Sequence, residues 1–80
     1  MSDGRGESEL IEIEAEIAGN IWKVEKAVGD TVEEEEVLLI LESMKMEIPV
    51  EAPCRGTVKE VRVQEGQTVD EGTVLVVLDV

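Results

Sequence analysis

The chain has 80 residues, a formal net charge of −13 and no histidine, tyrosine or phenylalanine. The absence of histidine removes the commonest general base and metal ligand, so we expect no catalytic residues and no metal site in this chain. A chain with so few lysines and arginines is also a poor ligand for nucleic acid or for an anionic membrane.

The N-terminal segment, residues 1–8, is polar and has no apolar periodicity, and we expect it to be disordered. One domain is expected over residues 9–80, because a chain of this length builds a single small core. No apolar stretch approaches the roughly 20 residues of a membrane span, and no hydrophobic signal region follows Met1. These features predict a cytoplasmic protein.

The rest of the chain is predicted to form short strands. From Ile11 to Ile17 apolar residues alternate with glutamates, which is the period of a strand with one buried face and one face in water. Further strands are predicted over 19–24, 31–32, 37–41, 46–50 and 56–63, at Val69, and over 74–80, with turns at Gly29, Gly66 and Gly72. Eight short strands with almost no helical periodicity predict an all-β domain.

Pro49 lies inside the predicted strand 46–50. A proline cannot donate a ladder hydrogen bond, so it restricts this strand to a sheet edge or a bulge. Two interpretations stay open. An edge beside Lys45 would suit docking by an enzyme, whereas a simple break in an exposed strand would have no functional role.

The sequence is an internal repeat with a period of 37 residues and no gap. The matched positions are Glu14-Ala15 with Glu51-Ala52, Gly19 with Gly56, Val24 with Val61, Gly29 with Gly66, Thr31-Val32 with Thr68-Val69, Val37-Leu38 with Val74-Leu75, and Leu41 with Leu78. Lys45 lies where the two copies meet, since one period back from it is Ser8 and one period forward passes Val80. We therefore expect Lys45 and the chain termini at opposite ends of the domain.

Several short motifs share one pattern with a known family. They are Glu42, Met44-Lys45-Met46, Gly29-Asp30, Ala52-Pro53 and Gly56-Thr57-Val58. From about Ile11 to Val80 the chain resembles the biotinyl domain of biotin-dependent carboxylases, and most of all the small free-standing biotin/lipoyl attachment proteins. Ser43, where alanine is commoner, and Glu35, where glycine is usual, depart from the pattern. The resemblance implies a flattened β-barrel, a barrel-sandwich hybrid of two four-stranded antiparallel sheets related by a pseudo-twofold axis.

The resemblance also implies a function, in which a biotin protein ligase attaches biotin covalently to Lys45. A biotin carboxylase would use ATP and bicarbonate to carboxylate the biotin, and a carboxyltransferase would pass the carboxyl group to an acceptor such as acetyl-CoA. The chain would be a non-catalytic carrier. Glu42, Met44 and Met46 would be recognised by the ligase and other partners, since methionine offers soft apolar surface that adapts to a pocket.

Lysine suits such a carrier because its flexible four-carbon stem ends in a primary amine that can form an amide with the carboxyl group of biotin. Lys23, Lys26 and Lys59 are assigned to predicted strands. Lys45 alone lies at the junction of the repeats, so a ligase can select it by position.

Two alternatives stay open. A lipoyl carrier shares the fold and the lysine turn but usually has Asp-Lys-Ala at the tip, so Met44 and Met46 favour biotin, and attachment of lipoate as well as biotin is the mixed case. An unmodified adaptor domain of the same fold is the alternative from a different class.

Three further residues carry expectations. Trp22, the only aromatic residue, aligns with Lys59. We expect its ring to be largely buried and to lie away from Lys45, so that Trp22→Ala costs about 3–5 kcal/mol of stability. Glu35 aligns with Gly72, so both should have positive φ if either does. Cys54 is expected to be a half-buried residue near a strand end and not a reactive thiol.

Overall fold

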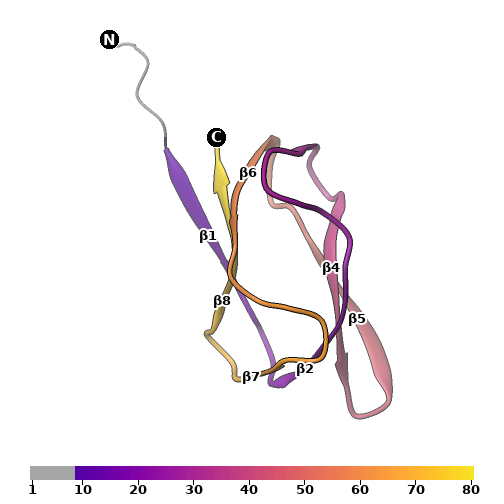
Figure 1. Cartoon of the computed structure of the whole chain (residues 1–80). Coiled ribbons are helices and arrows are strands. Elements are labelled where there is room, and N and C mark those ends of the chain that lie inside the picture. Colours follow the sequence, from indigo (N-terminus) through magenta and orange to yellow (C-terminus); the bar gives the residue numbers. More distant parts are fainter. Residues whose placement is uncertain (1–8) are drawn as a thin grey trace, which may run out of the picture.

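Two four-stranded antiparallel sheets pack face to face, as seen in a computed structural model that describes residues 9–80 (Figure 1). The expected disordered tail over residues 1–8 lies outside the described residues. The strands are β1 (Leu10–Glu14), β2 (Gly19–Val24), β3 (Thr31–Val32), β4 (Val37–Ser43), β5 (Met46–Glu51), β6 (Gly56–Val61), β7 (Thr68–Val69) and β8 (Val74–Asp79). No helix in this part of the chain is long and apolar enough to cross a membrane.

The strand order is β1-β8-β6-β3 in one sheet and β5-β4-β2-β7 in the other. Strands β4 and β8 have nearly continuous apolar sequences, because most of their side chains are buried or half-buried. Aliphatic side chains from both sheets form one core between them. Its largest fully buried members are Ile21, Leu38, Leu39, Leu41, Leu75, Leu78, Val32, Val58 and Val76. The all-β prediction and the two-sheet barrel are confirmed.

The repeat appears in the structure as a pseudo-twofold relation. Adding one period converts β2, β3 and β4 into β6, β7 and β8, and β1 corresponds to β5. Hydrogen bonds from the loops are related by the same period. The Gly29 N–H donates to the Val58 carbonyl at 2.9 Å, and the equivalent Gly66 N–H donates to the equivalent Ile21 carbonyl at 2.7 Å. Each sheet takes two strands from each copy, so the copies are interleaved and share one core.

Glu35 and Gly72 occupy equivalent turns with the same backbone conformation. Their φ angles are 71° and 88°, so the expectation of positive φ at Glu35 is confirmed. The Glu35 N–H donates to the Ala52 carbonyl and the Gly72 N–H to the Ala15 carbonyl, both at 2.8 Å. These matched bonds hold Glu35 in a conformation that a side chain with a Cβ atom disfavours.

We expect Glu35→Gly to raise the urea midpoint of unfolding. Glycine removes a conformational cost of roughly 1 kcal/mol and one of four consecutive negative charges, and the larger entropy of the unfolded chain offsets part of that gain. Glu34→Gly is the matched control, because it makes the same change of charge and entropy at a residue without positive φ. A midpoint for Glu35→Gly no higher than that of Glu34→Gly would contradict the prediction.

The prediction for Trp22 is wrong, because its side chain is 49% exposed. In the β2–β4 ladder Ile21 pairs with Leu41 and the next pair joins Lys23 to Ile40, so Trp22 is the extra residue of a β-bulge. Aliphatic side chains fill the core without the Trp22 ring. Because the ring is only about half buried, Trp22→Ala should cost less stability than the about 3–5 kcal/mol expected for a buried ring.

Smaller departures concern element ends. Strand β1 stops at Glu14, where the β1–β8 register shifts, although the Ala15 N–H still donates to the Thr73 carbonyl at 2.9 Å. Ile17 is consequently 41% exposed, although it continues the apolar alternation. Lys26 lies in the loop after β2 and not in a strand. Cys54 is half-buried between β5 and β6, as expected.

Candidate functional site

Lys45 lies in the two-residue turn that joins β4 to β5. Ser43 pairs with Met46 at the end of the ladder, and the residues between them, Met44 and Lys45, have φ angles of 51° and 66°. Two consecutive positive φ angles define a type I′ hairpin turn, which normally uses Asn-Gly or Asp-Gly. Holding two residues with Cβ atoms in this conformation costs roughly 1–2 kcal/mol each. Strain of this kind is typical of functional positions.

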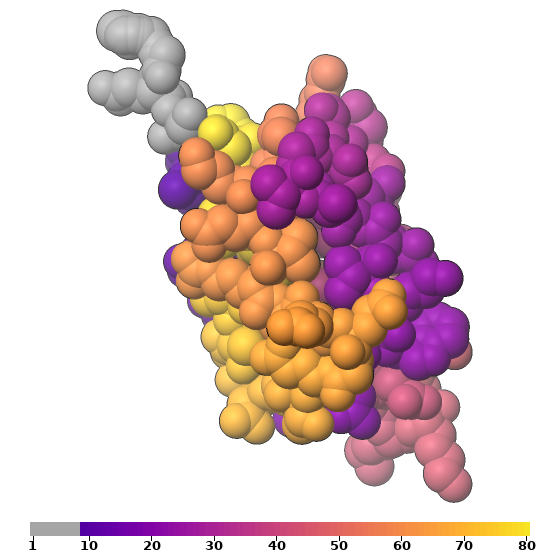
Figure 2. All heavy atoms as spheres, in the orientation of Figure 1, coloured from indigo at the N-terminus to yellow at the C-terminus, as the bar shows by residue number. Residues whose placement is uncertain are grey.

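The hairpin is anchored to the barrel by β2. Asn20 pairs with Glu42, and Gly19 approaches the hairpin so closely that a Cβ atom there would lie 2.5 Å from the Glu42 carbonyl oxygen. Beyond this contact the turn projects past the neighbouring strands, as the pink atoms show in Figure 2. Figure 1 places the turn at the opposite end of the barrel from the start of β1 and the end of β8, as expected for the described part of the chain.

The side chains of the turn face solvent. Lys45 is exposed, Met44 is 89% exposed and Met46 is 63% exposed. Glu42 and Glu47, also exposed, form a cross-strand pair next to the turn, and none of the ion pairs within residues 9–80 involves either carboxylate. The tip therefore carries one amine between two apolar side chains and above two adjacent negative charges.

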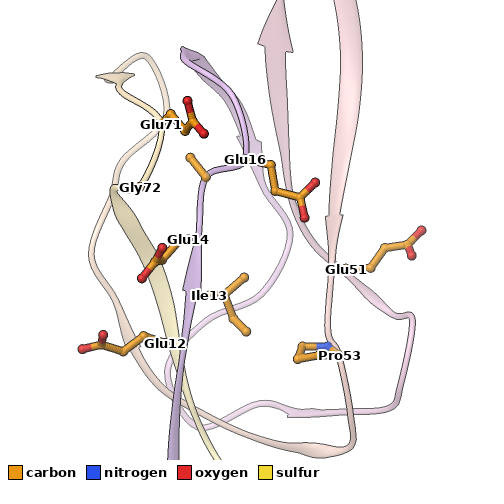
Figure 3. Close-up of a pocket in the computed structure, with 9 residues that line it drawn as sticks. Glu12, Ile13, Glu14, Glu16, Glu51, Pro53, Glu71 and Gly72 are labelled. Carbon is orange, nitrogen blue, oxygen red and sulfur yellow. The ribbon is translucent and has the colours of Figure 1, made fainter.

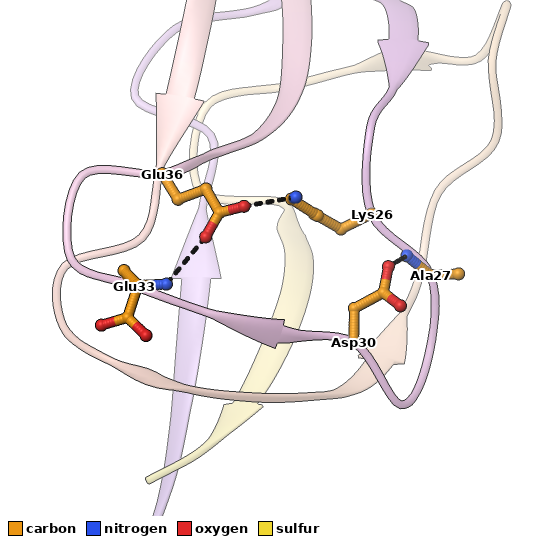
Figure 4. Close-up of polar contacts among 5 residues, drawn as sticks. All are labelled: Lys26, Ala27, Asp30, Glu33 and Glu36. Atoms are coloured by element: carbon orange, nitrogen blue, oxygen red, sulfur yellow. Dashed lines mark hydrogen bonds and ion pairs between the residues drawn. The ribbon is translucent and has the colours of Figure 1, made fainter.

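The other lysines lack this setting. Lys23 and Lys59 lie within β2 and β6, on the outer faces of the sheets. The Lys26 ammonium forms an ion pair with Glu36, and Glu36 also accepts a hydrogen bond from the Glu33 N–H at 2.9 Å (Figure 4). The hydrogen bond that Lys26 donates to Glu36 raises the pKa of Lys26, which makes its amine a poorer nucleophile. Among the described residues, Lys45 is the only lysine at the tip of a turn.

The Lys26–Glu36 pair predicts a pH-dependent contribution to stability. The hydrogen bond from Lys26, and then that from the Glu33 amide, lower the pKa of Glu36 below its ordinary value of 4.5. A lowered folded-state pKa stabilises the fold above the ordinary value, and this contribution is lost as the pH falls through the folded-state pKa. We expect Glu36→Gln to lower the urea midpoint near neutral pH and to differ less from wild type as the pH falls below 4.5. Glu34→Gln, a control at an exposed neighbouring glutamate, should show no such convergence.

Pro49 lies in β5, which is an edge strand of its sheet, so the predicted edge position is confirmed. The edges β5 and β1 border a groove of about 510 Å³ on the side of the barrel. It is lined by Glu12, Ile13, Glu14, Ala15, Glu16, Glu51, Pro53, Glu71 and Gly72 (Figure 3). The described residues contain no cluster of metal-ligating side chains, and five carboxylates make this groove repel anionic substrates.

Comparisons with known proteins agree with this geometry. The family model described as "Biotin-requiring enzyme" matches residues 8–78. The biotin/lipoyl attachment protein of Bacillus subtilis (strain 168) is 50% identical over 38 residues, which are 48% of this chain and 52% of that protein. The chain thus matches about half the length of this relative.

Two solved structures have the same fold. The urea carboxylase of Kluyveromyces lactis gives a TM-score of 0.84 with 29% identity, over 98% of this chain and 7% of that one. A single-chain, multi-domain long-chain acyl-CoA carboxylase gives a TM-score of 0.83 with 30% identity, over 88% of this chain and 7% of that one. The present chain is similar to one small part of each of these large proteins.

Proposed function

The chain belongs to the biotin/lipoyl attachment family, and on that premise we propose that it is a biotin carboxyl carrier with biotin joined to Lys45. The observation that carries this proposal is the exposed amine of Lys45 at the strained tip of the β4–β5 hairpin. A covalent cofactor needs an amine that an enzyme can reach from outside, and the hairpin offers one far from the rest of the barrel.

The hairpin residues fit the attachment. When bound, biotin supplies a ureido nitrogen that carries a carboxyl group between active sites. After ATP converts the biotin carboxylate into an acyl-adenylate, the neutral Lys45 Nζ attacks the acyl carbon. The C–N amide bond forms as the C–O bond to AMP breaks, AMP leaves, and the nitrogen gives up a proton. The four-carbon stem of Lys45 then gives the arm its reach, while the pairing of β4 with β2 holds its base still.

The barrel contributes delivery and not catalysis. Bicarbonate and coenzyme A thioesters are anions, and the net charge of −13 disfavours their binding to this surface. A tethered arm raises the local concentration of the carried group at each active site. We assign the two active sites to a biotin carboxylase and a carboxyltransferase, with an acyl-CoA such as acetyl-CoA as the acceptor. The similarity to parts of an acyl-CoA carboxylase and a urea carboxylase supports a carboxylase as the host.

A biotin protein ligase is the proposed modifying enzyme. Its recognition of the hairpin would use Glu42, Met44 and Met46, which are all exposed and lie within three residues of Lys45. The methionines can adapt to an apolar pocket, and Glu42 supplies a charge of fixed position on β4.

The test is the intact mass of the protein isolated from its native cell, followed by fragmentation to locate the modified residue. We expect one biotinyl group, on Lys45. A lipoyl group on Lys45 would replace the proposal with a lipoyl carrier. A population without any added group, from cells supplied with biotin, would indicate an unmodified adaptor domain.

A further inference from the structure

The pseudo-twofold relation pairs the outer faces of the two sheets residue by residue, and the two faces differ in chemistry. In one sheet, Lys59 is the extra residue of a bulge opposite Val77, and Glu12 pairs with Val77 from the other side. Arg62 forms an ion pair with Glu60 at 2.7 Å and approaches Glu12 at 4.0 Å. This face is polar, and Val77 beneath it is buried.

In the other sheet, Trp22, Ile40 and Pro49 occupy the positions equivalent to Lys59, Val77 and Glu12. We name these three residues the indole face. Trp22 is 49% exposed, Pro49 is exposed and Ile40 is only partly buried. Because the same bulge folds with lysine and glutamate in the other copy, the barrel does not require a tryptophan or a proline here. The indole face lies on the sheet that carries Lys45.

The distance from the indole face to Lys45 suits an enzyme that acts directly on the lysine. Ile40 precedes Lys45 by five residues, which corresponds to about 16 Å along an extended strand. A standard interface buries roughly 800 Å² on each partner, equivalent to a disc about 16 Å in radius. A footprint of that radius centred on the backbone of Lys45 therefore extends about as far as the indole face. Enzymes that act on biotin already joined to Lys45 bind its far end, so they lie farther from the barrel by the length of the biotin arm.

The charges between the indole face and the tip define the partner further. Glu42 and Glu47 lie directly opposite each other in the ladder, and like charges in that position repel. Cationic side chains of a partner would relieve this repulsion. Exposed tryptophan is the residue type most enriched among those that dominate binding energy at interfaces.

We propose that the indole face is a docking surface for the biotin protein ligase, which receives the Trp22 ring in an apolar pocket and meets Glu42 and Glu47 with arginine or lysine. This inference rests on the proposed function of Lys45. It adds a contact outside the Met44-Lys45-Met46 turn. Through that contact the ligase would distinguish this chain from other proteins that expose a lysine.

Trp22→Lys tests the proposal, because lysine is the residue that the equivalent bulge carries at position 59. With the ligase of the same cell, biotin and ATP, we expect the KM for this variant to rise at least tenfold and kcat to stay within twofold. Trp22→Phe should recover part of the loss. The double variant Trp22→Lys/Lys59→Trp keeps composition and net charge, and it should behave like Trp22→Lys. Lys59→Ala, on the polar face, should match wild type.

Binding is measured separately from turnover. Trp22 is the only tryptophan, so 5-fluorotryptophan labelling gives the protein a single ¹⁹F resonance. Titration with unlabelled ligase, without ATP, should shift that resonance. An unshifted resonance at saturating ligase, or a KM for Trp22→Lys equal to that of wild type, would overturn the docking surface. Wild-type protein that takes up no biotin while its resonance shifts would instead count against the proposed function and leave the docking surface supported.

Discussion

Lys45→Arg is expected to abolish biotin incorporation while the barrel stays folded. Arginine keeps the positive charge and the long stem, but its guanidinium does not form the amide. The side chain at position 45 is exposed, so the substitution leaves the packing of the core unchanged. Streptavidin detection and intact mass after incubation with ligase, biotin and ATP measure the loss, and thermal unfolding of the same sample checks the fold.

The control variants are Lys23→Arg and Lys59→Arg, which change lysines on the outer faces of the sheets. Both should keep full labelling. Biotin on the Lys45→Arg protein would show that another amine is the acceptor, and it would remove the functional meaning of the hairpin.

Leu41→Ala is expected to cause the largest loss of stability. Leu41 is 1% exposed and lies between Ile21 of β2 and Ile48 of β5, directly beneath the hairpin. Truncation of a buried leucine leaves a cavity and costs about 2–5 kcal/mol. At the usual stability per residue, the free energy of unfolding of the whole domain is roughly 4–12 kcal/mol, so the variant should unfold at a much lower urea concentration.

Leu10→Ala makes the same chemical change at a residue that is 53% exposed. Its urea midpoint should stay close to that of wild type, which separates the effect of the cavity from that of leucine itself. Similar midpoints for the two variants would show that Leu41 does not pack in the core as described.

The repeat and the alternation of apolar residues were sufficient to predict most of the fold. A period of 37 residues without a gap places equivalent strands and turns, so the eight strands and the position of Lys45 opposite the termini followed from it. It also predicted the positive φ of Glu35 from the glycine at position 72. These predictions succeeded because each depends on local backbone geometry that both copies must share.

The remaining features depend on properties that a repeat does not encode. Trp22 was expected to fill one end of the core, but it is the extra residue of a bulge with its side chain 49% exposed, and aliphatic residues form the core. The type I′ turn at Met44 and Lys45 lacks the glycine or asparagine that usually marks it. Ile17 continues the apolar alternation of β1 in the sequence, although the strand has already ended at Glu14. In the first two cases the departure from the expected pattern falls on a surface to which we assign a function.

The position of β8 constrains when Lys45 can be modified during the life of the protein. Strand β8 runs between β1 and β6, and without it the first strand has no partner and one side of the core is missing. A ribosome that has synthesised the hairpin still has to release residues up to Asp79 before the barrel can close. Pairings over so long a stretch of sequence form late and slowly. A ligase that recognises the folded hairpin would therefore act only after β8 has left the ribosome and paired, and the rate of folding would limit how soon Lys45 receives the proposed biotin.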